Sequence, residues 1–307
     1  MNEPEVRTDD TGSHRGHIVV GVDGSEHADR ALAWAARQAE LEHRPLTLLH
    51  AFDPVGRTLV GALELEGDNR LELLRTLRRD ARRTLDDAVD KVREIGPGLE
   101  MHHQLVDTDP RHALVKASTT AHLLVVGARG RGSLRGLLLG SVSVAVAQLA
   151  ECPTVVCRPP GTEPTIARIV VGADGSAASW PVIDFAFRQA SRRAVPLTVM
   201  HCFWEVTPAN APVGPDEGPV DMKVVLAESV AGFRESYPDV EVDLQLARGL
   251  VDRVLVDSAA SADLLVVGRR HKRAVARLLH ASMAAAVLER AAGTVAVVPE
   301  ADDLVER

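Results

Sequence analysis

Twice in this sequence an apolar run ends in a polar turn: Ile18-Val19-Val20-Gly21-Val22-Asp23-Gly24-Ser25, and again Ile169-Val170-Val171-Gly172-Ala173-Asp174-Gly175-Ser176. A run rich in β-branched residues is typical of a strand that is buried on both faces of a parallel sheet. The first turn is followed, over residues 28–42, by apolar residues at helical spacing. Each copy therefore opens with a strand, a tight turn and a helix.

Further ordered matches extend the repeat along the chain. Arg37-Gln38-Ala39 returns as Arg188-Gln189-Ala190, and Leu124-Val125-Val126-Gly127 returns as Leu265-Val266-Val267-Gly268. The second match has the smaller offset, so copy 2 has a shorter connection in its middle. Self-similarity on this scale indicates two copies of one structural unit.

The repeat also predicts the domain boundaries. Residues 158–164, Arg-Pro-Pro-Gly-Thr-Glu-Pro, have no periodicity and cannot continue a helix or strand. We therefore expect a disordered tail at 1–16, a first domain at 17–158, a linker at 159–166, a second domain at 167–299 and a tail at 300–307.

Within copy 1, strands alternate with helices. The expected strands are 18–22, 46–51, 100–106, 123–126 and 154–158, and the expected helices are 28–42, 70–95, 109–118 and 142–150. This alternation predicts an α/β fold: two tandem, doubly wound domains of Rossmann-like or flavodoxin-like type, each with a five-stranded parallel sheet.

Composition narrows the function classes. The 307 residues are 46% hydrophobic and 25% charged, which is enough apolar material for two cores. A net charge of −8 argues against a nucleic-acid-binding surface. No apolar run is long enough for a membrane span, and no signal peptide is recognisable. Three cysteines without a CxxC motif fit a reducing compartment, so we expect a cytoplasmic protein.

The segment after the fourth strand is rich in glycine and arginine. It reads Gly127-Ala128-Arg129-Gly130-Arg131-Gly132-Ser133-Leu134-Arg135-Gly136 and ends, before a helix, in Gly140-Ser141. Successive backbone N–H groups and a helix N-terminus favour an anion such as phosphate. A flexible surface loop with solvated arginines is the alternative. The loop is not a Walker A motif, because no Gly-Lys-Ser/Thr is present.

The spacing Gly127-x2-Gly130-x9-Gly140-Ser141 resembles the ATP-binding signature of the universal stress protein family. Asp23 matches that family's aspartate after the first strand, and Cys152-Pro153-Thr154-Val155-Val156 resembles its last strand. The resemblance covers nearly the whole chain, twice. It implies the universal stress protein fold and a nucleotide-sensing regulatory role in stress response or dormancy.

The resemblance also implies roles for matching positions. The adenine and ribose would contact Gly21, Val22, Asp23 and Ala51; the ribose and phosphates would contact Val126, Gly127, Arg129 and Gly130; the phosphates would be held by Gly140, Ser141, Val142 and Ser143. The ligand is expected to be ATP, for which Mg²⁺ is an optional companion. For Asp23, a helix N-cap is the alternative role.

Copy 2 departs from the signature, since His271 and Ala281 replace its second and third glycines. If the second glycine were left-handed, a β-carbon there would cost about 1–2 kcal/mol. A methyl group at Ala281 would stand where a phosphate must approach the backbone. We therefore expect copy 2 to bind ATP weakly or not at all, and to serve as a structural partner.

No catalytic constellation is recognisable in the sequence. His50 and His201 repeat at the second strand and are expected to be core or strand-end residues rather than general bases. A weak ATPase and a nucleotide-independent dimerising scaffold stay open as alternatives to the regulatory module. Members of the family dimerise, often through the last strand, which implies a homodimer and internal pairing of the two domains, because the edge of an open sheet needs cover.

Overall fold

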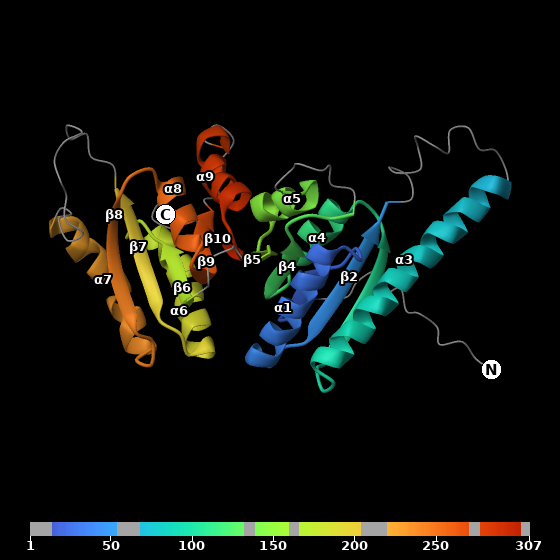
Figure 1. Ribbon diagram of the computed structural model, residues 1–307, viewed down its shortest axis with the longest axis horizontal. Coiled ribbons are helices and arrows are strands. Elements are labelled where there is room, and N and C mark those ends of the chain that lie inside the picture. The colour runs from blue at the N-terminus through green and yellow to red at the C-terminus, as the bar shows by residue number, and fades with distance from the viewer. Residues whose placement is uncertain are drawn as a thin grey trace, which may run out of the picture. The chain divides into compact units, whose positions relative to one another are not determined.

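The computed structural model describes residues 14–53, 68–131, 139–159, 166–203, 220–269 and 277–301. By their internal contacts the residues form two compact units, Met1–Cys152 and Pro153–Arg307. Both are built from strands that alternate with helices (Figure 1). The predicted α/β fold is confirmed, and the strands are mostly parallel, with the one antiparallel pair among the described strands between β5 and β10.

Unit 1 is a parallel sheet in the order β3-β2-β1-β4. Its elements are β1 (Ile18–Gly21), α1 (Glu26–Glu42), β2 (Leu46–Phe52), α3 (Asp68–Ile95), β3 (Met101–Asp107), α4 (Pro110–Ser118), β4 (Leu123–Gly127) and α5 (Ser141–Leu149). Helix α1 packs with α3 and α4 packs with α5, so the sheet is doubly wound. The strand order reverses beside β1, where such sheets bind ligands.

Unit 2 repeats this plan in the order β5-β10-β9-β6-β7-β8. Its elements are β5 (Thr154–Cys157), β6 (Ile166–Gly172), the 3-10 helix η1 (Ala177–Ser179), α6 (Trp180–Arg193), β7 (Leu197–Phe203), α7 (Val220–Ser236), β8 (Val242–Arg248), α8 (Val251–Ala259), β9 (Ala262–Arg269), α9 (Arg277–Arg290) and β10 (Val295–Pro299). Strand β5 lies antiparallel to β10, whereas β10 and β9 are parallel. The last strand of the first repeat is thus grouped with the last strand of the second.

Both expected tails are partly folded. His14 is buried, and Arg15 forms an antiparallel bridge with Ala121. At the other end, the amide of Glu300 donates to Arg269 O and that of Ala301 donates to Ala178 O. Residues 1–13, 160–165 and 302–307 of the expected tails and linker lie outside the described residues.

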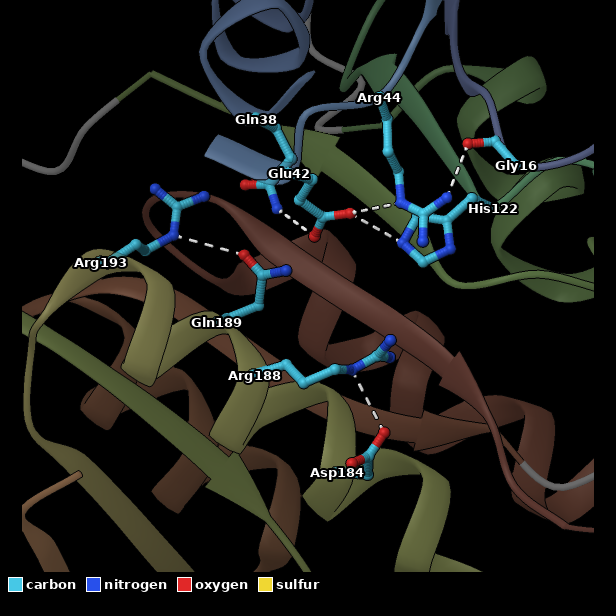
Figure 2. A network of polar contacts seen from close by, with 9 residues as sticks. All are labelled: Gly16, Gln38, Glu42, Arg44, His122, Asp184, Arg188, Gln189 and Arg193. Carbon is cyan, nitrogen blue, oxygen red and sulfur yellow. Dashed lines mark hydrogen bonds and ion pairs between the residues drawn. The ribbon is translucent and has the colours of Figure 1, made fainter. Parts of the chain in front are cut away.

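A polar network fixes the end of α1 in unit 1 (Figure 2). The side chain of Glu42, only 4% exposed, lies 2.7 Å from Gln38 Nε2, 3.2 Å from Arg44 Nε and 2.8 Å from His122 Nε2. Arg44 also donates to Gly16 O, at 3.0 Å. These contacts join the segment before β1 to the end of α1 and the start of β4.

Helix α6 of unit 2 carries polar pairs of its own. Arg188 Nε lies 3.2 Å from Asp184 Oδ2, and Arg193 Nε donates to Gln189 Oε1 at 3.4 Å (Figure 2). Both pairs are spaced one helical turn apart, the spacing at which side chains on one helix face meet. They support α6 locally.

The three cysteines are free thiols. Cys152 and Cys157 are buried, and burial raises the pKa of Cys202 to about 11. The two buried thiols therefore behave as small core side chains, and Cys202 is partly buried. Over the described part of the chain, no helix has the length and apolar character needed to cross a membrane.

Candidate functional site

A cavity of about 790 Å³ opens at the carboxyl ends of the strands of unit 1. This volume lies within the usual range for small-molecule sites, about 300–1,000 Å³. All twelve residues predicted from the sequence line it: Gly21, Val22, Asp23, Ala51, Val126, Gly127, Arg129, Gly130, Gly140, Ser141, Val142 and Ser143. The fold thus brings together positions that are more than a hundred residues apart in the chain.

Asp23 joins the two loops that frame the cavity. Its Oδ1 accepts the amide of Ser25 at 2.9 Å, and its Oδ2 accepts the amide of Arg131, also at 2.9 Å. Charge-assisted bonds of this kind are among the stronger hydrogen bonds in proteins. The Asp23 carboxylate therefore positions the loop that begins at Gly127, here called the glycine loop, against the end of β1. Asp23 also lines the cavity.

The alternative role proposed for Asp23, as a helix N-cap, is wrong. Ser25 is the N-cap of α1, and its hydroxyl accepts the amide of Ala28 at 3.2 Å. The Ser25 hydroxyl also lies 3.4 Å from Arg129 O. Because Ser25 caps the helix, the Asp23 side chain is available to accept the Arg131 amide in the loop after β4.

Close approach, not backbone handedness, explains two of the signature glycines. A β-carbon on Gly127 would lie 2.5 Å from the carbonyl carbon and oxygen of His27, and one on Gly130 would lie 2.5 Å from Asp23 Oδ2. Gly130 does not have a positive φ. The left-handed backbone on which the cost of a β-carbon at the second glycine was conditional is thus absent in copy 1, and the close approach of Asp23 explains this glycine instead.

The N-terminus of α5 faces the same cavity. Gly140, the N-cap, has an ordinary φ of −83°, and the first helical bond runs from Val144 N to Gly140 O. The amides at 141–143 precede that bond, so they are the free N–H groups of a helix start, which favour an anion. A β-carbon on Gly140 would come no closer than 3.4 Å to the protein. The fold itself does not require this glycine.

The Ser143 hydroxyl is not available to the phosphates that this residue was expected to help hold. It is buried, and its Oγ lies 2.7 Å from Gly127 O and 3.1 Å from Ala128 O. Because the hydroxyl has one proton, which these carbonyls attract, it cannot also donate to a ligand. Ser143 ties α5 to the end of β4, whereas the exposed Ser141 lines the cavity.

His50 is a strand-end residue, as predicted. It is buried at the cavity wall, and its Nδ1 lies 2.5 Å from Val22 O; in copy 2, His201 Nδ1 lies 3.0 Å from Ala173 O. A carbonyl can only accept, so Nδ1 carries the proton in both residues. Burial lowers the pKa of His50, which favours its neutral form.

Besides Asp23, at the end of β1, and Asp80, on α3, the charged residues of the cavity fall into two groups. Arg129 and Arg131 stand on the glycine loop, while Asp53, Asp109 and Arg111 come from the end of β2 and the start of α4. The second group was missed from the sequence, as were cavity residues on α3 such as Leu77, Asp80, Ala81 and Thr84. The carboxyl-end rule, applied to the second and third strands as well, would have found Asp53 and Asp109. Arg135 lies outside the described residues.

Copy 2 differs at each of these places. Its last helix, α9, begins at Arg277, so Ser282 lies inside the helix, whereas Ser141 begins α5. The amide of Ser282 follows the first four helical residues and is used within the helix. Beside Gly268 lies the Glu300 side chain, where copy 1 has the backbone of His27. The side chains of His271 and Ala281 are outside the described residues.

Among the described residues, no group of three or more His, Cys, Asp or Glu side chains could hold a metal ion. The carboxylates of Asp23, Asp53, Asp80 and Asp109 line the cavity, but they do not gather into such a group.

Comparison with known proteins agrees with the two repeats. The sequence model of the Universal stress protein family matches residues 14–158 and 165–299. A universal stress protein of Mycobacterium tuberculosis is 36% identical over 292 residues, covering 92% of this chain and 96% of that protein. One of Mycolicibacterium smegmatis is 33% identical over 291 residues, with the same coverage.

A solved structure extends the agreement to the fold. A universal stress protein from Archaeoglobus fulgidus has a TM-score of 0.65 and 18% identity, and the match covers 94% of this chain and 97% of that one. The repeated domain, its sheet order and the relatives lead to one conclusion: the chain belongs to the universal stress protein family and carries two domains of that family in tandem.

Proposed function

We propose that the first repeat binds ATP and that the protein acts as a nucleotide-sensing regulatory module in stress response or dormancy. The observation that carries the proposal is the cavity of unit 1, where the glycine loop and the N-terminus of α5 meet. The start of α5 presents backbone N–H groups, and Arg129 and Arg131, which line the cavity, add positive charge. This end of the cavity suits a chain of phosphates.

The opposite end of the cavity suits a nucleoside. Apolar side chains of Val22, Leu49, Leu77 and Leu114 line it and offer a surface to a base. Asp23 uses one lone pair of each carboxylate oxygen for a backbone amide, and the others can accept from ribose hydroxyls. ATP, bound alone or with Mg²⁺ held by its own phosphates, fills both ends.

Gly140 gives the proposal a direct test. Because the protein does not crowd a β-carbon at this position, Gly140→Ala should fold normally, while its methyl group intrudes between α5 and a phosphate. We expect calorimetric titration of ATP into nucleotide-free protein to show one site per chain, with affinity about tenfold weaker in the variant, a change of ~1.4 kcal/mol.

The matched control is Gly98→Ala. A β-carbon added at Gly98 would also have open space around it, but this residue lies just after α3 and does not line the cavity. The control variant should bind ATP as the wild type does. Absence of ATP binding by the nucleotide-free wild type would refute the proposal and leave a dimerising scaffold as the better account.

A further inference from the structure

Arg111 and Asp109 form a rigid pair at the cavity wall. Arg111 Nε lies 3.0 Å from Asp109 Oδ1, and Arg111 Nη2 lies 2.7 Å from Asp109 Oδ2. Oδ1 also accepts the amide of Arg111 at 2.8 Å, which makes Asp109 the N-cap of α4. A guanidinium held by two parallel bonds has a fixed plane. The pair is thus anchored to the helix rather than free to turn in solvent.

The pair keeps its charges over a wide pH range. The Arg111 guanidinium is the main cause that holds the pKa of Asp109 at about 2. The exposed fraction of the Arg111 side chain is 55%, so its face is accessible to a ligand in the cavity it lines.

Topology places Arg111 away from the glycine loop. The pKa of Arg111 is raised mainly by Asp109 and to a smaller extent by the negative charge of Asp53. Asp53 therefore lies near Arg111. Asp53 follows β2, and β2 is separated from β4 by β1 in the sheet. The glycine loop follows β4. If phosphates lie on that loop, Arg111 stands at the nucleoside end of the cavity.

Copy 2 has lost this pair together with the glycine signature. Leu250 is the N-cap of α8 and makes no side-chain capping bond, and Val251 is the first residue of the helix. Asp252, at the position that corresponds to Arg111, forms an ion pair with Arg290. The repeat that keeps the full signature is therefore the repeat that keeps the Asp–Arg pair.

We propose that Arg111, held flat by Asp109, is a specificity-determining residue that contacts the face of the nucleobase in the first repeat. The inference rests on the proposed function. Guanidinium planes stack on aromatic rings, including bases, and a plane fixed in advance loses little freedom on binding. Asp109 acts through Arg111 and is a positioning residue.

The test separates the two ends of the ligand by titrating the full-length protein with ATP, adenosine and inorganic tripolyphosphate. We expect Arg111→Ala to weaken ATP and adenosine by the same factor, about tenfold, and to leave tripolyphosphate unchanged. Asp109→Asn, which keeps a good N-cap residue, should give a smaller loss of the same kind. Arg93→Ala, which removes an exposed ion pair with Asp90 on α3, is the control and should change none of the three.

Each other outcome counts against the inference. Loss of tripolyphosphate affinity with adenosine unchanged would make Arg111 a phosphate ligand. Full rescue by Arg111→Lys would show that charge, not the guanidinium plane, is what the ligand contacts. If the wild type binds ATP and adenosine and Arg111→Ala binds both equally well, the inference fails while the proposed function stands; if the wild type binds none of the three, both fail.

Discussion

The two repeats share their strand ends and differ in what surrounds them. Gly24 and Gly175 have nearly the same positive φ, 72° and 77°, and Asp23 and Asp174 both accept the amide two residues later. Beyond these turns the repeats diverge. The side chains that lie against the turn glycine are those of Arg131 and Thr84 in copy 1 and that of Val225 in copy 2.

This difference shows which parts of the domain belong to the fold and which belong to the site. Strand ends, turns and the histidine–carbonyl bonds are present in both repeats, so they support the sheet. The helix start at Ser141 and the Asp109–Arg111 pair are present in copy 1 alone among the described residues. Features that a repeat can lose without losing its sheet are not required by the fold, and they are the ones that the proposed function uses.

The largest expected effect comes from adding a methyl group to the same glycine in each repeat. Gly127→Ala places a β-carbon 2.5 Å from backbone atoms of His27, which cannot move without shifting α1, and should lower the free energy of unfolding of unit 1 by about 3 kcal/mol. In Gly268→Ala the obstacle is the flexible Glu300 side chain, so the loss should stay below about 1 kcal/mol. Hydrogen exchange resolved by peptide would measure each unit separately, and equal losses would contradict the contrast.

A smaller effect should follow from removing the aspartate of each repeat. Asp23→Ala releases the amide of Arg131 and with it the glycine loop, and should weaken ATP binding by about tenfold or more. Asp174→Ala removes bonds to Ser176 and should leave ATP affinity unchanged. Titration calorimetry decides between this outcome and an equal contribution of both repeats.

The smallest expected effect is a dependence on pH of the stability of unit 1 that unit 2 should not share. His14 and His17 lie near His102, with Glu100 and Thr47 beside them, and burial followed by the neighbouring imidazoles lowers the pKa of His14 and of His17 below 6.5. The unfolded chain then binds protons more readily than unit 1 does. The stability of unit 1 should therefore be greatest above pH 6.5 and decline as the pH falls below it.

Unit 2 provides the comparison for that pH dependence, because Arg168 stands where the repeat has His17. Exchange rates followed from pH 7.5 to 5.5, corrected for intrinsic rates, should show a decline in unit 1 that His17→Gln reduces. An unchanged slope in that variant would remove the histidine cluster as the cause.

Much of the site was predictable because its parts obey local rules. Parallel strands bring their carboxyl ends to one edge, and the spacing of Gly127, Gly130 and Gly140 marks the segment that follows β4. The contact that gives Gly130 its reason depends on how two distant loops pack. The N-cap of α1 is a local matter, because the Ser25 hydroxyl accepts the amide of Ala28, three residues later. Arg111 was missed because Asp109-Pro110-Arg111 reads, in the sequence, as the ordinary exposed start of a helix.

The antiparallel pair β5–β10 carries a consequence for how the protein responds to dilution. Every residue of β5 is buried, and its partner strand belongs to the other repeat of the same polypeptide. If the two repeats were separate chains, the β5–β10 pair would dissociate at low concentration. Here one polypeptide carries both strands, so the effective concentration of one strand at the other does not fall with the concentration of the protein. A cell holding only a few copies of this chain would still hold the two last strands together.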